Sequence, residues 1–217
     1  LINQPDKAGS YPLHLAIWRM NSIMIPARDS PASIYHFETA VDSLLAANAD
    51  TAVRDGRGNT LLHYLAGSRL GERDRMGDGQ RRFLRRFLKD GVDPRARNAA
   101  GMTALEIFCT VSYDEFGDEG FYDRYFAIAQ DVIGQFEKAG YNIQETNAKG
   151  QTLLHLIAGL TSSEGISWSA WPWFQLLRSK GLDPMAKDGE GKTPIDIAEE
   201  NESIDVWLLE ERESIVA

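Results

Sequence analysis

The chain has 217 residues, of which 43% are hydrophobic, and a formal net charge of −9. The hydrophobic share is sufficient for a continuous core, whereas the negative charge argues against general nucleic-acid binding. The sequence has no apolar run long enough for a membrane span, and its single cysteine, Cys109, excludes an internal disulfide framework and favours a reducing compartment. We therefore expect an intracellular protein, cytoplasmic or nuclear, with no membrane span.

One short pattern recurs along the chain and is clearest in residues 55–66. There Gly58 can adopt the positive φ of a tight turn, and Thr60 stands as the N-cap of the helix that follows. His63, the third residue of that helix, can reach back to the cap. The five copies share Asp or Asn three residues before the glycine, and all but the first, which has Tyr11, carry Thr two residues after it: the glycines are Gly9, Gly58, Gly101, Gly150 and Gly191.

A second pattern precedes each of the last four turns. A predicted helix ends at Gly or Asn ten residues before the turn glycine, at Asn48, Gly91, Gly140 and Gly181. The link between helix end and turn is therefore constant, and the variable length falls between the two helices of each unit. The predicted helices include 11–20, 34–47, 61–66, 81–89, 104–111, a long helix that ends at 137, and an acidic helix at 202–213; the predicted insertions are 25–31, 67–79, 113–122 and 162–167.

The segments Asn59–His63 and Gly191–Pro194, with Gly-x-Asp closing the preceding unit, resemble ankyrin repeats over nearly the whole chain. The resemblance implies an all-α solenoid of antiparallel helix pairs joined by short hairpin-like turns, in one domain over 1–217. The first four units are longer than the roughly 33 residues of the family. We expect the chain to be a fragment of a longer protein, because it begins with Leu. The expected repeats are about 1–54, 55–97, 98–146, 147–187 and 188–217.

Residues that could carry chemistry have simpler structural interpretations. His14, His63 and His155 occupy the same position in three repeats, so we expect them to hold the turns and not to converge on a metal or substrate. Cys109 follows apolar residues and is expected to be a small buried hydrophobe. The Gly191–Thr193 segment matches a relaxed phosphate-binding loop but lacks the preceding strand. We therefore predict no enzyme activity, no cofactor and no metal.

The resemblance implies protein binding through the turn tips and inner helices. The alternative is an intramolecular regulatory or scaffold segment of a larger enzyme or signalling protein. We expect a protein partner, whose identity the sequence does not give, and a monomer in isolation. The residues predicted at the tips are Lys7, Ser10, Arg57, Asn59, Met102, Lys149, Gln151, Glu190 and Lys192.

Two clusters leave alternatives open. Arginines recur on one face of the predicted helix 81–89, and they form either a solvated face, a set neutralised by the acidic insertion 114–119, or a dock for an acidic or phosphate-bearing partner. Three tryptophans either fold the fourth insertion onto the repeats or form an exposed patch that anchors partners. The arginines are Arg81, Arg82, Arg85 and Arg86, and the tryptophans are Trp168, Trp171 and Trp173.

Overall fold

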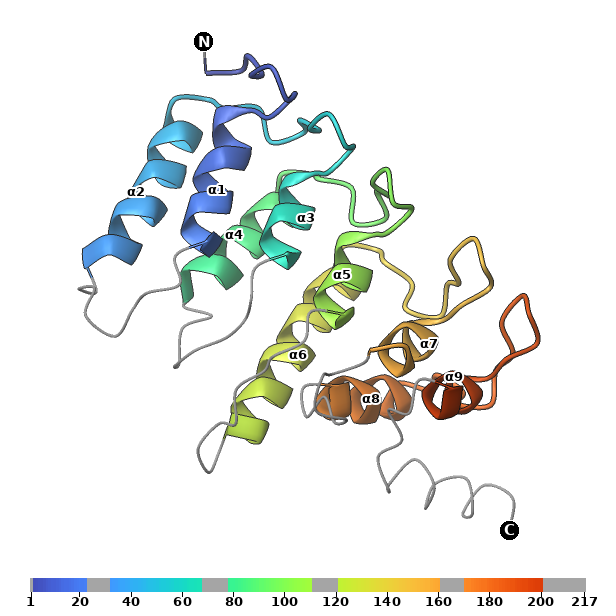
Figure 1. Ribbon diagram of the computed structural model, residues 1–217. Helices are drawn as coiled ribbons and strands as arrows, with labels where there is room; N and C mark the ends of the chain where they lie inside the picture. The colour runs from blue at the N-terminus through green and yellow to red at the C-terminus, as the bar shows by residue number, and fades with distance from the viewer. Residues whose placement is uncertain (1, 23–31, 68–77, 111–120, 161–169, 201–217) are drawn as a thin grey trace. The chain divides into compact units, whose positions relative to one another are not determined.

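The computed structural model describes residues 2–22, 32–67, 78–110, 121–160 and 170–200 (Figure 1). Over these ranges the chain is all-α, as expected, with nine helices and no strand. The helices are α1 (Pro12–Ser22), α2 (Ala32–Ala46), α3 (Leu61–Ala66), α4 (Asp78–Lys89), α5 (Ala104–Thr110), α6 (Phe121–Lys138), α7 (Leu153–Ala158), α8 (Ala170–Ser179) and α9 (Pro194–Glu200).

The predicted helix bounds agree closely with these elements. The largest difference among the predicted starts is in α4, which begins at Asp78 instead of Arg81. In the first turn of this helix, Gly79 packs against the side chain of Glu38, and a Cβ at this position would clash with the Glu38 carboxylate. The segments 23–31, 68–77, 111–120, 161–169 and 201–217, which include most of the predicted insertions and the helix expected at 202–213, lie outside the described residues.

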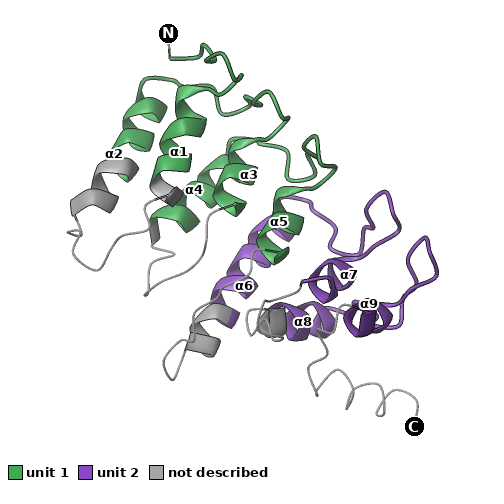
Figure 2. Ribbon diagram, in the orientation of Figure 1, with its two compact units in different colours: residues 1–111 green, residues 112–217 purple. Residues whose placement is uncertain are grey.

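Two compact units divide the chain, Leu1–Val111 and Ser112–Ala217 (Figure 2). In the first, α1 packs against α2 and α3, and α3 packs against α4 and α5. Helix α3 has only 6 residues, too few to be stable in water, so its tertiary contacts must hold it. These contacts bury Leu13, Ile17, Val41, Leu61, Leu62, Leu65, Phe83, Leu84 and Phe87.

The second unit follows the same plan. Helix α8 packs against α6 and α7, and α7 also packs against α9. Trp173 of α8 is buried in this core, which favours the interpretation that it anchors its helix and not a partner. The other core residues include Val132, Ile133, Phe136, Leu153, Leu154, Leu176, Leu177 and Ile195.

Five turns with the same hydrogen bonds precede α1, α3, α5, α7 and α9. In the second, Oδ1 of Asp55 accepts from the backbone N–H groups of Arg57 and Asn59, both at 2.8 Å, and Gly58 has φ +75°. An L-residue with a Cβ rarely adopts this dihedral angle. The equivalent side chains in the other turns, Asp6, Asn98, Asn147 and Asp188, accept the same pair of bonds.

The predicted helix ends are also confirmed. Asn48, with φ 60°, and the three glycines at the equivalent positions adopt the left-handed conformation. At the first of them the N–H of Ala49 donates to the carbonyl of Leu44 at 2.9 Å, the bond that closes a helix in a Schellman motif. The three glycines are Gly91, Gly140 and Gly181.

Candidate functional site

The turn tips present side chains that differ from one turn to the next. Lys7, Arg57, Lys149 and Glu190 are exposed, and within the described part of the chain their side chains form no hydrogen bond or ion pair. Ser10 and Met102, also predicted at the tips, are half-buried. Four of the predicted residues therefore have side chains available to a partner.

The second and third turns are joined through their tips. The carbonyl of Arg57 accepts from the N–H of Ala99 at 2.8 Å. Asn59 donates to Oδ2 of Asp55 at 3.0 Å and accepts from Nδ2 of Asn98 at 2.9 Å. Asn59 was predicted to contact a partner, but its amide nitrogen is bonded within its own turn and its amide oxygen is bonded to the next turn.

Two more of the predicted residues are engaged inside the second unit. Oε1 of Gln151 accepts from Nδ2 of Asn147 at 3.1 Å. Nζ of Lys192 lies 2.6 Å from Oε2 of Glu200, an exposed ion pair. Such a pair contributes little to stability, but it engages the Lys192 ammonium group. Gln151 and Lys192 would therefore have to give up these interactions in order to contact a partner.

The arginines of α4 are paired in part with acidic groups of the same unit. Arg82 makes a bidentate contact with Asp42 of α2, at 3.2 and 2.9 Å, and lies 3.8 Å from Glu38. Arg86 pairs with Asp90 at 2.7 Å. One of the three alternatives, neutralisation by the acidic insertion 114–119, lies outside the described residues. Among the described residues, α2 supplies the acidic partners of Arg82.

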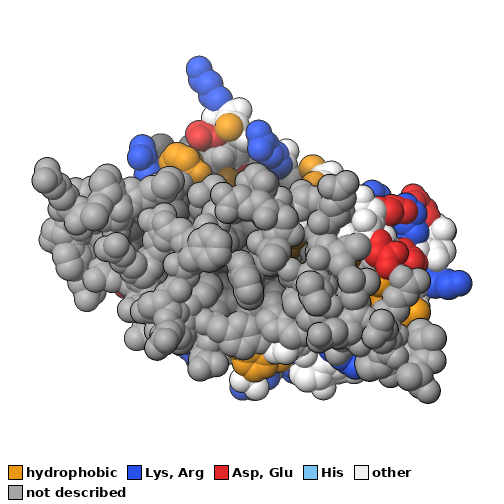
Figure 3. Space-filling view, turned by 60° about the horizontal axis from the view of Figure 1, so that its bottom comes forward, with side chains coloured by type: hydrophobic (Ala, Val, Ile, Leu, Met, Phe, Trp, Pro, Cys, Tyr) orange, Lys and Arg blue, Asp and Glu red, His pale blue; other side chains and the backbone are white. Residues whose placement is uncertain are grey.

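The other two arginines of α4 are not isolated either. Arg81 and Arg85 both interact with neighbouring groups. In Figure 3, Lys and Arg side chains lie next to Asp and Glu side chains on the face drawn. The described charged side chains that show on that face are therefore of both signs.

His63 connects the second turn to the third. Its Nδ1 lies 3.1 Å from the N–H of Thr60, and its Nε2 lies 3.0 Å from the carbonyl of Met102. Because a backbone N–H can only donate, Nδ1 must be the acceptor, and Nε2 carries the hydrogen that it donates to the carbonyl. The neutral ring therefore caps its own helix and links it to the next turn, as the expected structural role requires.

His155 repeats this arrangement in the second unit. Its Nδ1 lies 3.1 Å from the N–H of Thr152, and its Nε2 lies 3.1 Å from the carbonyl of Lys192. The ring is buried. The fourth turn is thus linked to the fifth by the same side chain, in the same tautomer, as the second is to the third.

His14 is bound less completely. Its Nδ1 accepts from the N–H of Tyr11 at 3.3 Å, and its ring stacks on Tyr64 with centroids 4.7 Å apart. Its buried Nε2 has no hydrogen-bonding partner among the described residues, although the backbone of Val53 is close enough to influence its pKa. The first turn therefore lacks the direct histidine link that the second and fourth turns make.

We predict that the stability of the first unit falls as the pH drops below 6.5. Burial lowers the pKa of His14 and of His63 below that ordinary value, against opposing effects that include the charge of Asp55. Between pH 6.5 and the lowered pKa values, these two histidines take up protons in the unfolded chain but not in the folded chain. The free energy of unfolding therefore decreases as the pH falls.

The measurement is the urea midpoint at pH 7.5 and at 5.5. The wild-type protein should unfold at lower urea at pH 5.5, and His63→Gln, which removes one of the two groups, should show a smaller difference between the two pH values. Equal midpoints for the wild-type protein at both pH values would contradict the prediction.

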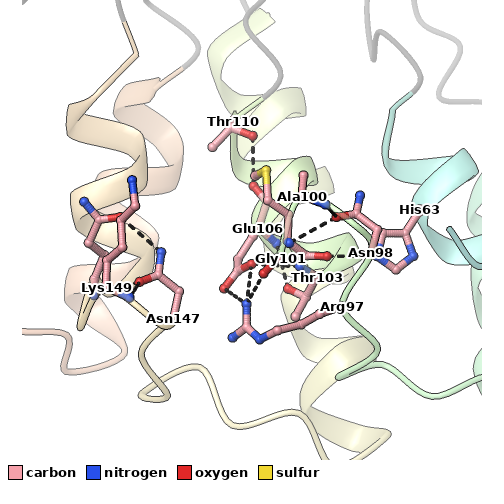
Figure 4. A network of polar contacts seen from close by, with 12 residues as sticks. His63, Arg97, Asn98, Ala100, Gly101, Thr103, Glu106, Thr110, Asn147 and Lys149 are labelled. Atoms are coloured by element: carbon pink, nitrogen blue, oxygen red, sulfur yellow. Dashed lines mark hydrogen bonds and ion pairs between the residues drawn. The ribbon is translucent and has the colours of Figure 1, made fainter. Parts of the chain in front are cut away.

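The third turn uses an ion pair where the second and fourth use histidine (Figure 4). Glu106 stands in the register of His63 and is buried. Its Oε2 accepts from the N–H of Thr103 at 2.7 Å, which completes the predicted capping box. Nη1 of Arg97 lies 3.0 Å from both carboxylate oxygens and 2.7 Å from the carbonyl of Gly101. Sequence reasoning identified the cap but not Arg97, which lies nine residues away on the other side of the turn.

Cys109 and groups of possible metal ligands are the remaining candidates for reactive chemistry. Burial raises the pKa of the Cys109 thiol well above its usual value, which keeps it protonated at neutral pH and therefore a poor nucleophile. In the ranges that the structure covers, no group of three or more His, Cys, Asp or Glu side chains is placed to hold a metal ion. Trp168 lies outside these ranges, as does the side chain of Trp171.

Comparison with known proteins adds no assignment, since neither the known protein families nor the curated proteins contain a match to this chain. None of the helices that the structure describes has both the length and the apolar character needed to cross a membrane.

Proposed function

We propose that the chain is a non-catalytic protein-interaction module built of five ankyrin-like repeats, acting inside the cell, which binds a protein partner through its turn tips and inner helices. The observation that supports this function best is the contrast between the turns' constant framework and their variable side chains. The five turns share one pattern of hydrogen bonds, anchored at Asp6, Asp55, Asn98, Asn147 and Asp188. The side chains that project from this framework are cationic at Arg57 and Lys149 and anionic at Glu190.

A rigid framework suits recognition because little conformational entropy is lost when a partner binds. The turns are fixed by backbone and Asp or Asn side-chain bonds, so the exposed tips are presented in a defined geometry. Repeat proteins form extended surfaces of this kind by stacking similar units. The arginines of α4 are a weaker candidate, because Arg82 and Arg86 already have carboxylate partners.

We expect the double variant Arg57→Glu, Lys149→Glu to lose a partner that the wild-type protein retains in a pull-down from a lysate of the source organism, read by mass spectrometry. Reversal of an interface charge places like charges together and weakens binding. The matched control is Lys89→Glu, Lys138→Glu, which makes the same change of charge at one exposed position of α4 and one of α6.

All three proteins should first show the same helical content. The tip variant should keep the urea midpoint of the wild-type protein because its two positions are exposed. The control should lose no more than about 1 kcal/mol per site, because Lys89 and Lys138 lie in the last turns of their helices. Loss of the partner from the control but not from the tip variant would place binding on α4 or α6 and contradict the proposal. Identical profiles for all three would also contradict it.

A further inference from the structure

Helix α1 exposes two large apolar side chains on one face. Leu15 and Trp18 are 42% and 49% exposed, whereas Leu13 and Ile17 of the same helix are fully buried. Residues three apart in a helix lie on the same side, so the exposed pair forms one patch. Among the described residues, only one other large apolar side chain, Met185 in the second unit, is classed as exposed, at 38%.

Among the described residues, the patch carries one positive charge, that of Arg19. The guanidinium of Arg19 lies 5.3 Å from the centroid of the Trp18 ring, a cation–π contact, and no ion pair of Arg19 occurs among the described residues. Neither α1 nor α3, which packs against it, contains Asp or Glu. The acidic residues of α2 do not compensate this charge, because Glu38 and Asp42 face Arg82 of α4.

We propose that α1 binds an acidic amphipathic segment of a protein partner, with an apolar side chain of the partner on Leu15 and Trp18 and a carboxylate on Arg19. This inference rests on the proposed function in assuming a protein partner, but it assigns a surface distinct from the turn tips. Tryptophan and arginine are the residue types that contribute most to protein interfaces. The ring contact orients the guanidinium of Arg19 while its N–H groups can still donate to a carboxylate.

The size and chemistry of the patch select the partner. Two apolar side chains form a small contact area, from which a single aliphatic or aromatic side chain of the partner can exclude water. Once water is excluded, a carboxylate next to Arg19 is favourable and a lysine in the same place is repelled. A wholly apolar partner would leave the Arg19 charge without a counter-ion.

A selection of displayed random peptides on the full chain tests the inference. Enriched peptides should combine Asp or Glu with Leu, Ile, Phe or Trp. They should bind the variant Leu15→Ser, Trp18→Ser at least about tenfold more weakly than the wild-type protein, as expected for loss of anchoring contacts. Arg19→Glu should reverse the preference for acidic peptides. Met185→Ser, which removes an exposed apolar side chain from the second unit, is the matched control and should bind as the wild-type protein does.

The other outcomes overturn the inference. They are no enrichment, enrichment of peptides without acidic residues, or equal binding to the wild-type protein and to the Leu15→Ser, Trp18→Ser variant. Peptides lost only from Arg57→Glu, Lys149→Glu would support the turn-tip proposal while removing this one. A concentration-dependent dimer, measured by light scattering and abolished by Trp18→Ser, would assign the patch to a second copy of the chain.

Discussion

Replacement of Glu106 by alanine is expected to destabilise the first unit by about 2 to 3 kcal/mol. Glu106 is 4% exposed. Its carboxylate accepts hydrogen bonds from the N–H of Thr103 and, through both oxygens, from Arg97. Removal leaves a buried N–H without an acceptor and a guanidinium without its counter-charge. The Arg97 side chain is 35% exposed, so water can solvate part of it, and the loss should stay below that of a fully buried pair.

Urea unfolding of the variant, compared with two controls, gives the measurement. Glu106→Gln retains an oxygen that can accept from Thr103 but lacks the charge, so its loss should be smaller than that of Glu106→Ala. Glu190→Ala removes an exposed carboxylate at a turn tip and should change stability by less than about 0.5 kcal/mol. If the free energy of unfolding of Glu106→Ala differs from that of the wild-type protein by less than this same margin, the Glu106–Arg97 pair makes no net contribution to stability.

Sequence patterns predicted the helices and turns because their causes are local. Gly58 and Thr60 act within a few residues of one another, and the spacing between a helix end such as Gly91 and the next turn glycine repeats along the chain. The all-α architecture and the left-handed glycines follow from such signals. The ankyrin-like assignment itself remains a proposal.

Side-chain partners were harder to predict because many of them depend on packing between segments far apart in sequence. Asn59 donates to Asp55 within its own turn, but its bond from Asn98 comes from the approach of the next turn, 39 residues along the chain. The acidic partner of Arg82 on α2, Asp42, lies 40 residues away. Counting charges along the chain could not decide between Asp42 and the acidic insertion 114–119 as the partner of Arg82.

Arg97 shows how a missed residue could have been found. His63 both accepts from its cap and donates to the next turn. A glutamate in the same register can accept from the cap but has no hydrogen to donate. The buried carboxylate needs a donor and a counter-charge, and Arg97 supplies both to Glu106 while it also donates to the carbonyl of Gly101 in the same turn. A buried acid in the histidine register is thus a signal to search for a nearby arginine.

Gly150→Ala is expected to destabilise the second unit by about 3 kcal/mol. The left-handed conformation, with φ +75°, costs an alanine about 1 to 2 kcal/mol. The added Cβ would also lie 2.8 Å from the backbone nitrogen of Gly189, whose N–H donates to the carbonyl of Lys149 at 2.8 Å. Overpacking of this kind costs about 1 to 3 kcal/mol, because backbone atoms cannot turn aside as a flexible side chain can.

Gly191→Ala separates these two causes. Gly191 has the same register and a similar φ, +82°, but a Cβ there meets no atom within 4 Å. Its alanine variant should lose only the conformational share, about 1 to 2 kcal/mol, measured as the difference in urea unfolding from the wild-type protein. Equal losses at Gly150 and Gly191 would mean that the fourth and fifth turns move apart at little cost. A larger loss at Gly150 would mean that the direct backbone contact, and not the glycine dihedral alone, holds successive turns in register. This is the rigidity that the proposed recognition through the turn tips requires.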